Sequence, residues 1–563
     1  MASTVPPPPR TLRDHLTLES PGATRGYWAG VGLVAASMYV PRLLPCVDYP
    51  QHLGLADMAR RLSDPSAPEH KTHVFNAFTY NGLFHVVVSR LGKVMPIELA
   101  GRTVVAFSLL LLGAACLALL KVLRRPASYA ALTTPFLFSF ALGWGFVNYT
   151  LGTALAVTTC VFIATSLQRL RWWSLLGTFV VGLLCGMTHV LATILLCIFA
   201  VALAPEISLR SVEAKSLPGR LGKAFLRCFA ALSPLLGTAV WCVAVAIQQY
   251  KWNPGVYKDP TLEGTSPPIW QKLAYFCSWA TGAHSDLTDQ MLTFLSLVVL
   301  VGAMGIGLVR LARKQAWDGA LAPAEEADPD SDRPAPPLVL PFVAMMTAYL
   351  LTPMVFIGTH LIFPRLTQLV AITAVLAAPR YSARLWPNVR FTARTLGVLA
   401  GLNLFVHAAI FARETDDASK IIDLLPPGRR ATAVIYDGSS FAFRNGSLAH
   451  LAAYYGARKQ GEWAFSFARY LSVPVRFKAG GNPWWPQRGW EFGPREYNPR
   501  CHYARYFPLV IVKAPNGLPT DASAEQAVRE LVFMRDANAV KLLGHVGHYW
   551  AFDSEGLPED GTY

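Results

Sequence analysis

An acid and an imidazole lie close together in the stretch Leu44-Pro-Cys-Val-Asp-Tyr-Pro-Gln-His-Leu53. Asp48 is of the type that takes a proton from a hydroxyl as a general base, and His52 is placed to orient that base or to share its proton. The stretch directly follows the apolar residues 27–44 and opens a loop that runs to residue 97. This pair therefore predicts a reaction site where a helix leaves a membrane.

A cation of a different kind occurs in Thr359-His-Leu-Ile-Phe-Pro-Arg-Leu-Thr-Gln368, where Arg365 is surrounded mainly by apolar residues. A buried guanidinium needs a partner, and a phosphate suits it through bidentate hydrogen bonds. Two interpretations are open: Arg365 binds a phosphate at the bilayer surface, or it pairs with Asp48 or another acid of the same face.

Other polar side chains stand at the ends of apolar segments that should reach the same face. We predict that they bind substrate together with Arg365, and they are His360, Asn148, His189 and His284. Several candidates also have a purely structural interpretation. Asp48 could cap a helix over residues 50–62, Asn148 could cap the helix that follows it, and His189 could be a hydrogen-bonded bundle residue. Asp57, in the first loop, is expected on a solvated helix face.

The elements that position these residues are membrane helices. The chain has 563 residues, of which 53% are hydrophobic and only 15% charged, against about 25% charged in soluble domains. Apolar runs of about twenty residues, long enough to span a bilayer as helices, recur from residue 27 to residue 412. We predict about eleven spanning helices, near residues 27–44, 98–120, 128–146, 149–167, 172–186, 189–204, 227–248, 287–309, 338–357, 362–378 and 395–412.

The distribution of charge orients these helices. The net charge is +15, but the lysines and arginines collect in particular short loops, as the positive-inside rule describes for membrane proteins. This pattern argues against a nucleic-acid partner. It predicts a cytoplasmic N-terminus and puts Asp48 and Arg365 outside. It also favours a hairpin that turns near Gly186-Met-Thr-His189, because the basic connector from Arg210 to Arg227 then stays inside.

The sequence thus predicts an α-helical multi-pass membrane protein with a small C-terminal α/β domain. Its parts are a cytoplasmic N-terminal segment (1–26), an N-terminal transmembrane block (27–312) with a long first outer loop (45–97), a disordered cytoplasmic linker (313–337), a C-terminal transmembrane block (338–412) and an extracytoplasmic domain (413–563). In that domain we expect strands at 431–436, 508–512 and 540–543 and helices at 447–457 and 523–537. A disulfide among Cys46, Cys277 and Cys501, the cysteines outside the apolar runs, is left open.

Four short motifs give the chain a resemblance to a known superfamily. They are Val47-Asp-Tyr-Pro-Gln-His52, Val147-Asn-Tyr-Thr-Leu-Gly152, Met187-Thr-His189 and Phe363-Pro-Arg365. Over roughly residues 27 to 412 the chain resembles the GT-C superfamily of integral-membrane glycosyltransferases. The resemblance implies transfer of a sugar from a polyprenyl-phosphate carrier to a lipid or glycan acceptor, on the outer face of a bacterial inner membrane.

The same resemblance implies roles for two residues, with Asp48 as the base and Arg365 as the cation that holds the phosphate. We expect an inverting reaction that needs no cofactor. Many members have a second acid beside the first and another in the second outer loop, where this chain has Tyr49 and Asn148. These departures argue against a metal at the site of the base.

Two other functions remain open from the sequence. One is a non-catalytic or flippase-like membrane component that binds lipid-linked saccharide, and the other is a solute transporter. A transporter should carry charges near the bilayer midplane, whereas the charged residues here collect at the ends of the apolar segments.

Overall fold

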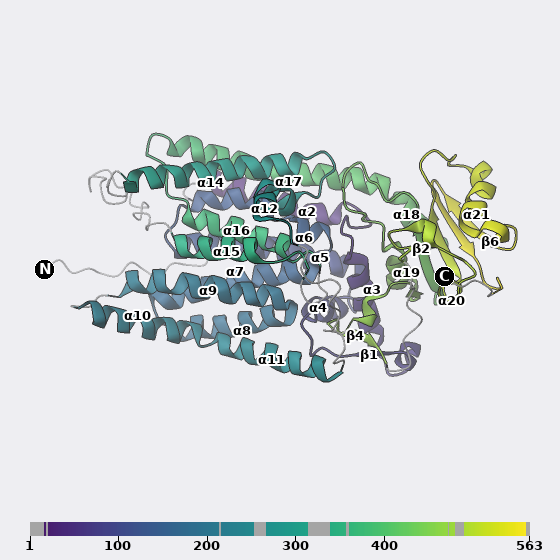
Figure 1. Ribbon diagram of the computed structural model, residues 1–563, viewed down its shortest axis with the longest axis horizontal. Coiled ribbons are helices and arrows are strands. Elements are labelled where there is room, and N and C mark those ends of the chain that lie inside the picture. The colour runs from purple at the N-terminus through teal and green to yellow at the C-terminus, as the bar shows by residue number, and fades with distance from the viewer. Residues whose placement is uncertain are drawn as a thin grey trace.

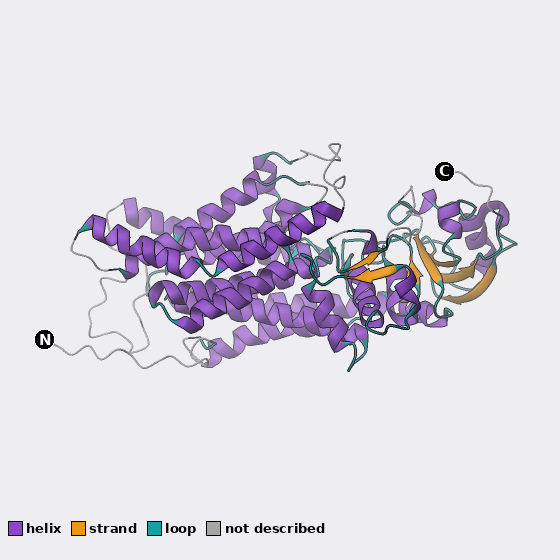
Figure 2. Cartoon of the chain, turned by 90° about the horizontal axis from the view of Figure 1, so that it is seen from below, coloured by secondary structure: helices purple, strands orange, loops and turns teal. Residues whose placement is uncertain are grey.

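A bundle of long helices carries an α/β domain at one end (Figure 1). The computed structural model describes residues 16–18, 21–212, 216–252, 266–312, 338–355, 360–470, 472–478 and 489–558. The linker expected at 313–337 and the first fifteen residues lie outside this part of the chain. The strands gather at one end of the molecule, beyond the long helices of the bundle (Figure 2).

Five helices of the described chain are long and apolar enough to cross a membrane, or six if one bent pair counts as a single span. The five are α5 (Ile97–Val122), α7 (Val147–Gln168), α9 (Val190–Ser211), α14 (Thr288–Ala312) and α17 (Trp386–Glu414). Shorter bundle helices are α2 (Pro21–Ala36), α8 (Trp172–Thr188), α10 (Leu217–Leu232), α11 (Leu235–Trp252), α15 (Val339–Leu351) and α16 (Ile362–Ala377). The number of crossings, about eleven from the sequence, stays a prediction.

The expected hairpin is present, because His189 alone separates α8 from α9. Three expected boundaries are wrong. Helix α2 already ends at Ala36, and the segment 128–146 is a 3₁₀ helix, η3 (Ala127–Phe136), followed by the short α6 (Phe140–Gly143). Pro135 lies inside η3, where its ring removes a backbone donor.

The third difference concerns the basic connector. Helix α10 begins at Leu217, so Arg220 and Arg227 lie on a helix and not in a loop. The chain bends by 50° between α10 and α11, at Ser233 and Pro234, where proline interrupts the hydrogen bonds of a continuous helix.

Helix α16 is the central helix of the bundle, since all of its 16 residues are buried. A helix that is apolar all round belongs in such a position. The exceptions to that apolar character are therefore informative, and the first turn of α16 carries Arg365.

The basic loops predicted to lie inside meet at one end of the bundle. Arg125 Nη2 donates to the carbonyl of Ala378 (2.5 Å), and Gln168 Nε2 donates to that of Val122 (2.6 Å). Arg310 likewise reaches the carbonyl of Arg380. The loop with Asp48 lies at the opposite end, beside the α/β domain.

The C-terminal domain contains a five-stranded sheet of order β3-β2-β5-β7-β6. Strands β3, β2 and β5 are parallel, whereas β7 pairs antiparallel with both β5 and β6. The strands are β2 (Arg430–Ile435), β3 (Glu462–Trp463), β5 (Leu509–Lys513), β6 (Lys541–Val546) and β7 (Tyr549–Asp553), and the main helices are α18 (Asp416–Leu424), α19 (Leu451–Lys459) and α21 (Glu525–Phe533). The three strands and two helices expected from the sequence are therefore present within a few residues.

This domain is built together with the first loop of the bundle. Strand β1 (His73–Phe75) of that loop pairs antiparallel with β4 (Val475–Phe477), and α3 (Tyr49–Arg61) packs on α19. Gln51 Oε1 accepts hydrogen bonds from Trp463 Nε1 (2.7 Å) and from the backbone of Phe467 (3.3 Å). The segment that carries Asp48 is thus packed between the helices and the C-terminal domain.

Candidate functional site

Asp48 is held at the end of the bundle by the turn between α6 and α7. The backbone N–H of Val47 donates to the carbonyl of Gly143 (3.1 Å), and that of Asp48 donates to the carbonyl of Trp144 (3.0 Å). Gly145 follows with a φ of +87°, and a Cβ there would lie 2.4 Å from the nitrogen of Asp48. Glycine is required at this position, because any side chain would push Asp48 away.

The side chain of Asp48 does not cap a helix. Asp48 is the N-cap residue of α3 but makes no side-chain hydrogen bond to it. Its Oδ1 lies 3.2 Å from Nε2 of His450, which comes from the C-terminal domain, and its side chain is 16% exposed. The structural interpretation of Asp48 as a helix cap therefore fails, and a partner from a distant part of the chain takes its place.

His450 connects two carboxylates. Its Nδ1 lies 2.5 Å from Glu491 Oε1 and 3.0 Å from Gln51 Nε2. Burial by itself lowers the pKa of His450, but the charge of Glu491 and the hydrogen bond to Asp48 outweigh it and raise the pKa to about 9. At neutral pH an imidazolium therefore stands between Asp48 and Glu491.

The raised pKa of His450 predicts a pH-dependent stability. The imidazole titrates near 6.5 in an unfolded chain and at about 9 in the folded protein. The folded state thus binds this proton more tightly, and the stabilisation is complete below about pH 6.5 and is lost as the pH rises through about 9. We expect the melting temperature to fall over this interval, and we expect a smaller fall in His450→Gln.

Thermal melting at a series of pH values between these limits measures the effect. His70→Gln, at the edge of the first loop, is the matched control and should follow the wild type. An identical pH slope in His450→Gln and the wild type would show that the ion pair contributes nothing.

His52 is paired with a second histidine of the same loop. Its Nδ1 lies 3.1 Å from His85 Nε2, and His85 Nδ1 lies 2.7 Å from the carbonyl of Asn81. A carbonyl only accepts, so His85 holds its proton on Nδ1, and its Nε2 accepts a hydrogen bond from the Nδ1–H of His52. Burial, followed by the neighbouring His85, His189 and His450, lowers the pKa of His52. His52 is therefore neutral and keeps a lone pair on Nε2.

Arg365 is 5% exposed and is held in a fixed orientation. Its Nε donates to the carbonyl of Leu361 (3.1 Å) and its Nη2 to that of His360 (2.9 Å), while the guanidinium stacks 3.6 Å from the ring centre of Phe146. Its Nη1 lies 3.2 Å from His189 Nε2. Among the described residues no carboxylate forms an ion pair with Arg365, so its charge has no close counter-ion.

His189 brings a second donor to Arg365. Its Nδ1 accepts a hydrogen bond from the backbone N–H of Leu191 (3.1 Å), which makes it the cap of α9. A neutral ring with an accepting Nδ1 carries its proton on Nε2. That N–H then faces Nη1 of Arg365, and two donors meet where an anion could accept from both.

Asn148 lies in the first turn of α7, between Phe146 and Tyr149. The hydroxyl of Tyr149 donates to the carbonyl of Arg365 (2.6 Å), which places this turn against α16. Asn148 is 2% exposed, and within the described chain neither polar atom of its side chain has a hydrogen-bond partner. Since Phe146 is the N-cap of α7, the capping interpretation of Asn148 does not apply.

The remaining two candidates are placed differently. His360 contributes its carbonyl to Arg365, while the residue itself is exposed. His284 contacts the rings of His407 and Phe443 and the amide of Asn403, not Arg365. The structure thus brings Asp48, His52, His189 and Arg365 to one end of the bundle and puts His284 in a cluster of its own. All nine cysteines are free thiols.

The sequence does not single out His450, Glu491 or His85. His450 is 402 residues from Asp48, and no local spacing indicates that contact. His85 lies in the first turn of a short helix (Leu83–Leu91), in a loop that contains many polar residues. The only sequence signal is that these residues occur in segments expected on the same face as Asp48.

Comparison with known proteins identifies the fold. No family model matches the chain, and no curated protein matches it by sequence. Two solved structures of ArnT from Cupriavidus metallidurans are similar to it. The apo form has 11% identity and a TM-score of 0.50 over 93% of this chain and 96% of that one.

The form bound to undecaprenyl phosphate has 10% identity and a TM-score of 0.50, over 96% of this chain and 99% of that one. ArnT has the GT-C fold, so the GT-C fold expected from the sequence motifs is confirmed. At this identity the comparison establishes the fold alone. Together with the apolar helices, it makes this chain a multi-pass membrane protein.

Proposed function

We propose that this protein is a GT-C glycosyltransferase that moves a sugar from a polyprenyl-phosphate carrier to a lipid or glycan acceptor. The observation that carries the proposal is Arg365, a buried guanidinium at the end of the bundle where Asp48 lies, which forms no ion pair with a carboxylate of the described residues. The fold supports it, because a protein of the same fold has been solved with undecaprenyl phosphate bound.

The phosphate of the carrier is the anion that fits Arg365 and His189. In the apolar surroundings of α16 an anion gains more from these donors than it would in water. A phosphate accepts bidentate hydrogen bonds from a guanidinium, and Nη1 of Arg365 and Nε2–H of His189 point to a common place. The charge that gathers on the leaving phosphate during transfer would be stabilised by the same two groups.

Asp48 is the proposed base. Its carboxylate takes the proton of the acceptor hydroxyl as that oxygen attacks the anomeric carbon, and the bond from this carbon to the phosphate oxygen breaks. The electron pair of the broken bond stays on the polyprenyl phosphate. One displacement of this kind inverts the anomeric centre. Neutral His52, with its free Nε2, is proposed to accept a hydrogen bond from the acceptor or to share the proton.

The remaining polar groups fit a sugar. The unsatisfied amide of Asn148 would bond to sugar hydroxyls, and His360 lies at the exposed side of Arg365. The reaction needs no cofactor in this scheme. We place the site on the outer face of a bacterial inner membrane, with the N-terminus in the cytoplasm and the C-terminal domain outside, because the basic loops lie at the opposite end.

Asn148→Leu separates folding from function. A buried amide without a partner costs roughly 1–3 kcal/mol, so the leucine variant should melt at a temperature equal to or above that of the wild type. Its donor KM should rise about tenfold or more, because a group that bonds to a sugar hydroxyl is lost. Melting curves and donor titrations measure the two quantities, and an unchanged KM would exclude Asn148 from the donor site.

The experiment for the proposed function is transfer by purified protein in lipid nanodiscs. The protein is given a panel of polyprenyl-phosphate sugars, and mass spectrometry follows free polyprenyl phosphate and the glycosylated acceptor. Donor consumption that depends on Asp48 supports a transferase. Saturable donor binding at Arg365 with no turnover for any acceptor would favour the non-catalytic saccharide-binding protein instead.

A further inference from the structure

A second cluster of metal-ligating side chains lies apart from Asp48 and Arg365. His284 and Asp286 stand in the turn before α14, and His407 comes from α17. One ligand atom of each lies within 4.8 Å of the others. His284 is 2% exposed and His407 6% exposed, whereas the side chain of Asp286 is 48% exposed. Two imidazoles and a carboxylate from distant parts of the chain thus meet near the membrane surface.

The ring of His407 is oriented by its own helix. Its Nδ1 lies 2.9 Å from the carbonyl of Asn403, one turn earlier in α17. A carbonyl only accepts, so His407 holds a proton on Nδ1. Its Nε2 lies 3.2 Å from Oδ2 of Asp286. In the neutral ring this nitrogen has a lone pair and faces a carboxylate oxygen, which has no proton to offer.

The ring of His284 is oriented by the side chain of the same asparagine. Asn403 Nδ2 lies 3.0 Å from His284 Nδ1, and Asn403 Oδ1 lies 3.1 Å from Thr288 Oγ1. Thr288 gives its single hydroxyl proton to Asp286 Oδ1 (2.7 Å), so none is left for the oxygen of Asn403. Half a turn of the amide exchanges its two ends. Then Nδ2 donates to Thr288 Oγ1, and Oδ1 accepts from His284 Nδ1–H.

In that arrangement the Nδ1–H of each imidazole is bonded to an oxygen of Asn403, so both rings keep a lone pair on Nε2. The rings stack with centres 4.0 Å apart at 14°. Two stacked imidazolium ions would repel each other. Three acceptors thus converge without a donor between them, an arrangement that a cation stabilises.

We propose that His284, Asp286 and His407 bind a divalent transition-metal ion, with zinc as the first choice. Imidazole ligands suit zinc and its neighbours, whereas calcium and magnesium prefer oxygen alone. Nε2 ligation with Nδ1–H bonded to a carbonyl is the usual support for a metal-bound histidine. Zinc–ligand distances of about 2.0–2.2 Å require the three atoms to close together, and the half-exposed Asp286 has the freedom to do so.

The position of the site indicates a structural role. The turn with His284 forms a backbone bridge with Phe443, and Arg444 N–H donates to the carbonyl of Ala283 (2.8 Å). Phe443 packs on both histidines and on Phe411. A metal here would link α17 to the turn between α13 (Phe276–Thr281) and α14. This turn contacts the segment around Phe443, which leads on to His450.

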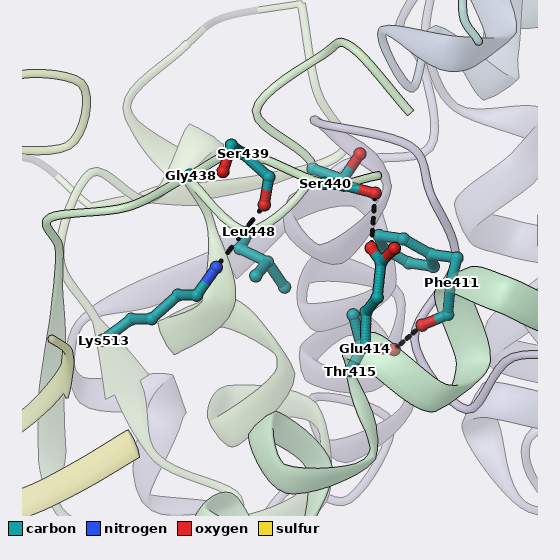
Figure 3. Close-up of a pocket in the computed structure, with 9 residues that line it drawn as sticks. Phe411, Glu414, Thr415, Gly438, Ser439, Ser440, Leu448 and Lys513 are labelled. Carbon is teal, nitrogen blue, oxygen red and sulfur yellow. Dashed lines mark hydrogen bonds between the residues drawn. The ribbon is translucent and has the colours of Figure 1, made fainter. Parts of the chain in front are cut away.

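The last turn of α17 contacts the same segment at a second point. Glu414 accepts from Ser440 Oγ (2.6 Å) and from the backbone N–H of Phe441 (3.1 Å). Figure 3 shows Glu414 and Ser440 facing each other in a small pocket that Phe411 and Lys513 also line. The proposed metal and Glu414 would thus fix two points of one connection between bundle and domain.

Metal binding by the full-length protein tests the proposal. Wild-type protein in nanodiscs is stripped with a chelator and titrated with Co²⁺, whose visible absorption reports the ligands, and Zn²⁺ affinity is then measured by competition. We expect one equivalent of zinc and a higher melting temperature with the metal. Asp286→Asn and His407→Gln should each weaken binding at least tenfold, since even indirect supports of a metal contribute about 10–100-fold.

Asp286→Asn is the decisive variant, because its half-exposed side chain can change without disturbing the bundle. His70→Gln is the matched control and should bind zinc as the wild type does. Equal zinc affinity in Asp286→Asn and the wild type would overturn the proposal. So would the absence of stoichiometric metal in the wild type. Since no sugar transfer is measured, the outcome is independent of the proposed function.

Discussion

Asp48→Asn should lower the rate of sugar transfer by about 10²- to 10⁴-fold, the usual contribution of a general base, while donor affinity stays near that of the wild type. The amide has almost the shape of the carboxylate, so the backbone contacts with Gly143 and Trp144 are kept. Its oxygen still accepts from His450 Nε2. What is lost is the ability to take a proton from the acceptor. Single-turnover kinetics and donor titration measure the two quantities separately.

The matched control is Asp64→Asn, which changes an acid of the same loop that is fully exposed. This variant should transfer sugar at the wild-type rate. If Asp48→Asn also retained that rate, the base would have to be another group. The nearest candidates are then His52 and Glu491, both in the same cluster of residues around His450.

Arg365→Ala should weaken donor binding and lower kcat together, with a combined loss in kcat/KM of at least about 10²- to 10³-fold. Its guanidinium is proposed to hold the phosphate in the ground state and to stabilise the charge that the phosphate gains on leaving. Arg365→Lys should recover part of the loss, because an ammonium supplies the charge without the planar fork of donors. Binding of polyprenyl phosphate and transfer kinetics measure the effect.

Arg365 also holds the carbonyls of Leu361 and His360, so folding needs its own control. The melting temperature of each variant is compared with that of Arg384→Ala, which removes an exposed arginine at the opposite end of the bundle. A folded Arg365→Ala with unchanged donor affinity would remove the phosphate role. If Arg365→Ala does not fold, Arg365→Lys is the test. Full donor affinity and full kcat in Arg365→Lys would contradict the claim that the guanidinium binds the phosphate through two hydrogen bonds.

The sequence predicts the parts of this protein that depend on local pattern. Apolar length gives most of the bundle helices, and short apolar runs give β2, β5 and β6. The sorting of basic loops to one end places Asp48 and Arg365 at the other. The hairpin at His189 follows from the same charge argument, because a single crossing would carry the basic connector across.

Contacts between distant segments are beyond such patterns. Asp57 is expected in solvent but is buried, because Arg60 and Arg61 both pair with it (2.7 and 3.1 Å). The sequence predicts that His284 binds substrate together with Arg365, whereas the packing of α17 places it against His407. His450 meets Asp48 only because β1 and α3 of the first loop pack into the C-terminal domain.

The central claim is that a polyprenyl-phosphate sugar lies between Arg365 and Asp48. Its most direct test is an experimental structure of Asp48→Asn in nanodiscs with such a donor, since this variant should bind the donor without consuming it. The account predicts the phosphate within hydrogen-bonding distance of Arg365 Nη1 and His189 Nε2, with the anomeric carbon facing residue 48. A donor phosphate held elsewhere, away from both Arg365 and His189, would contradict it.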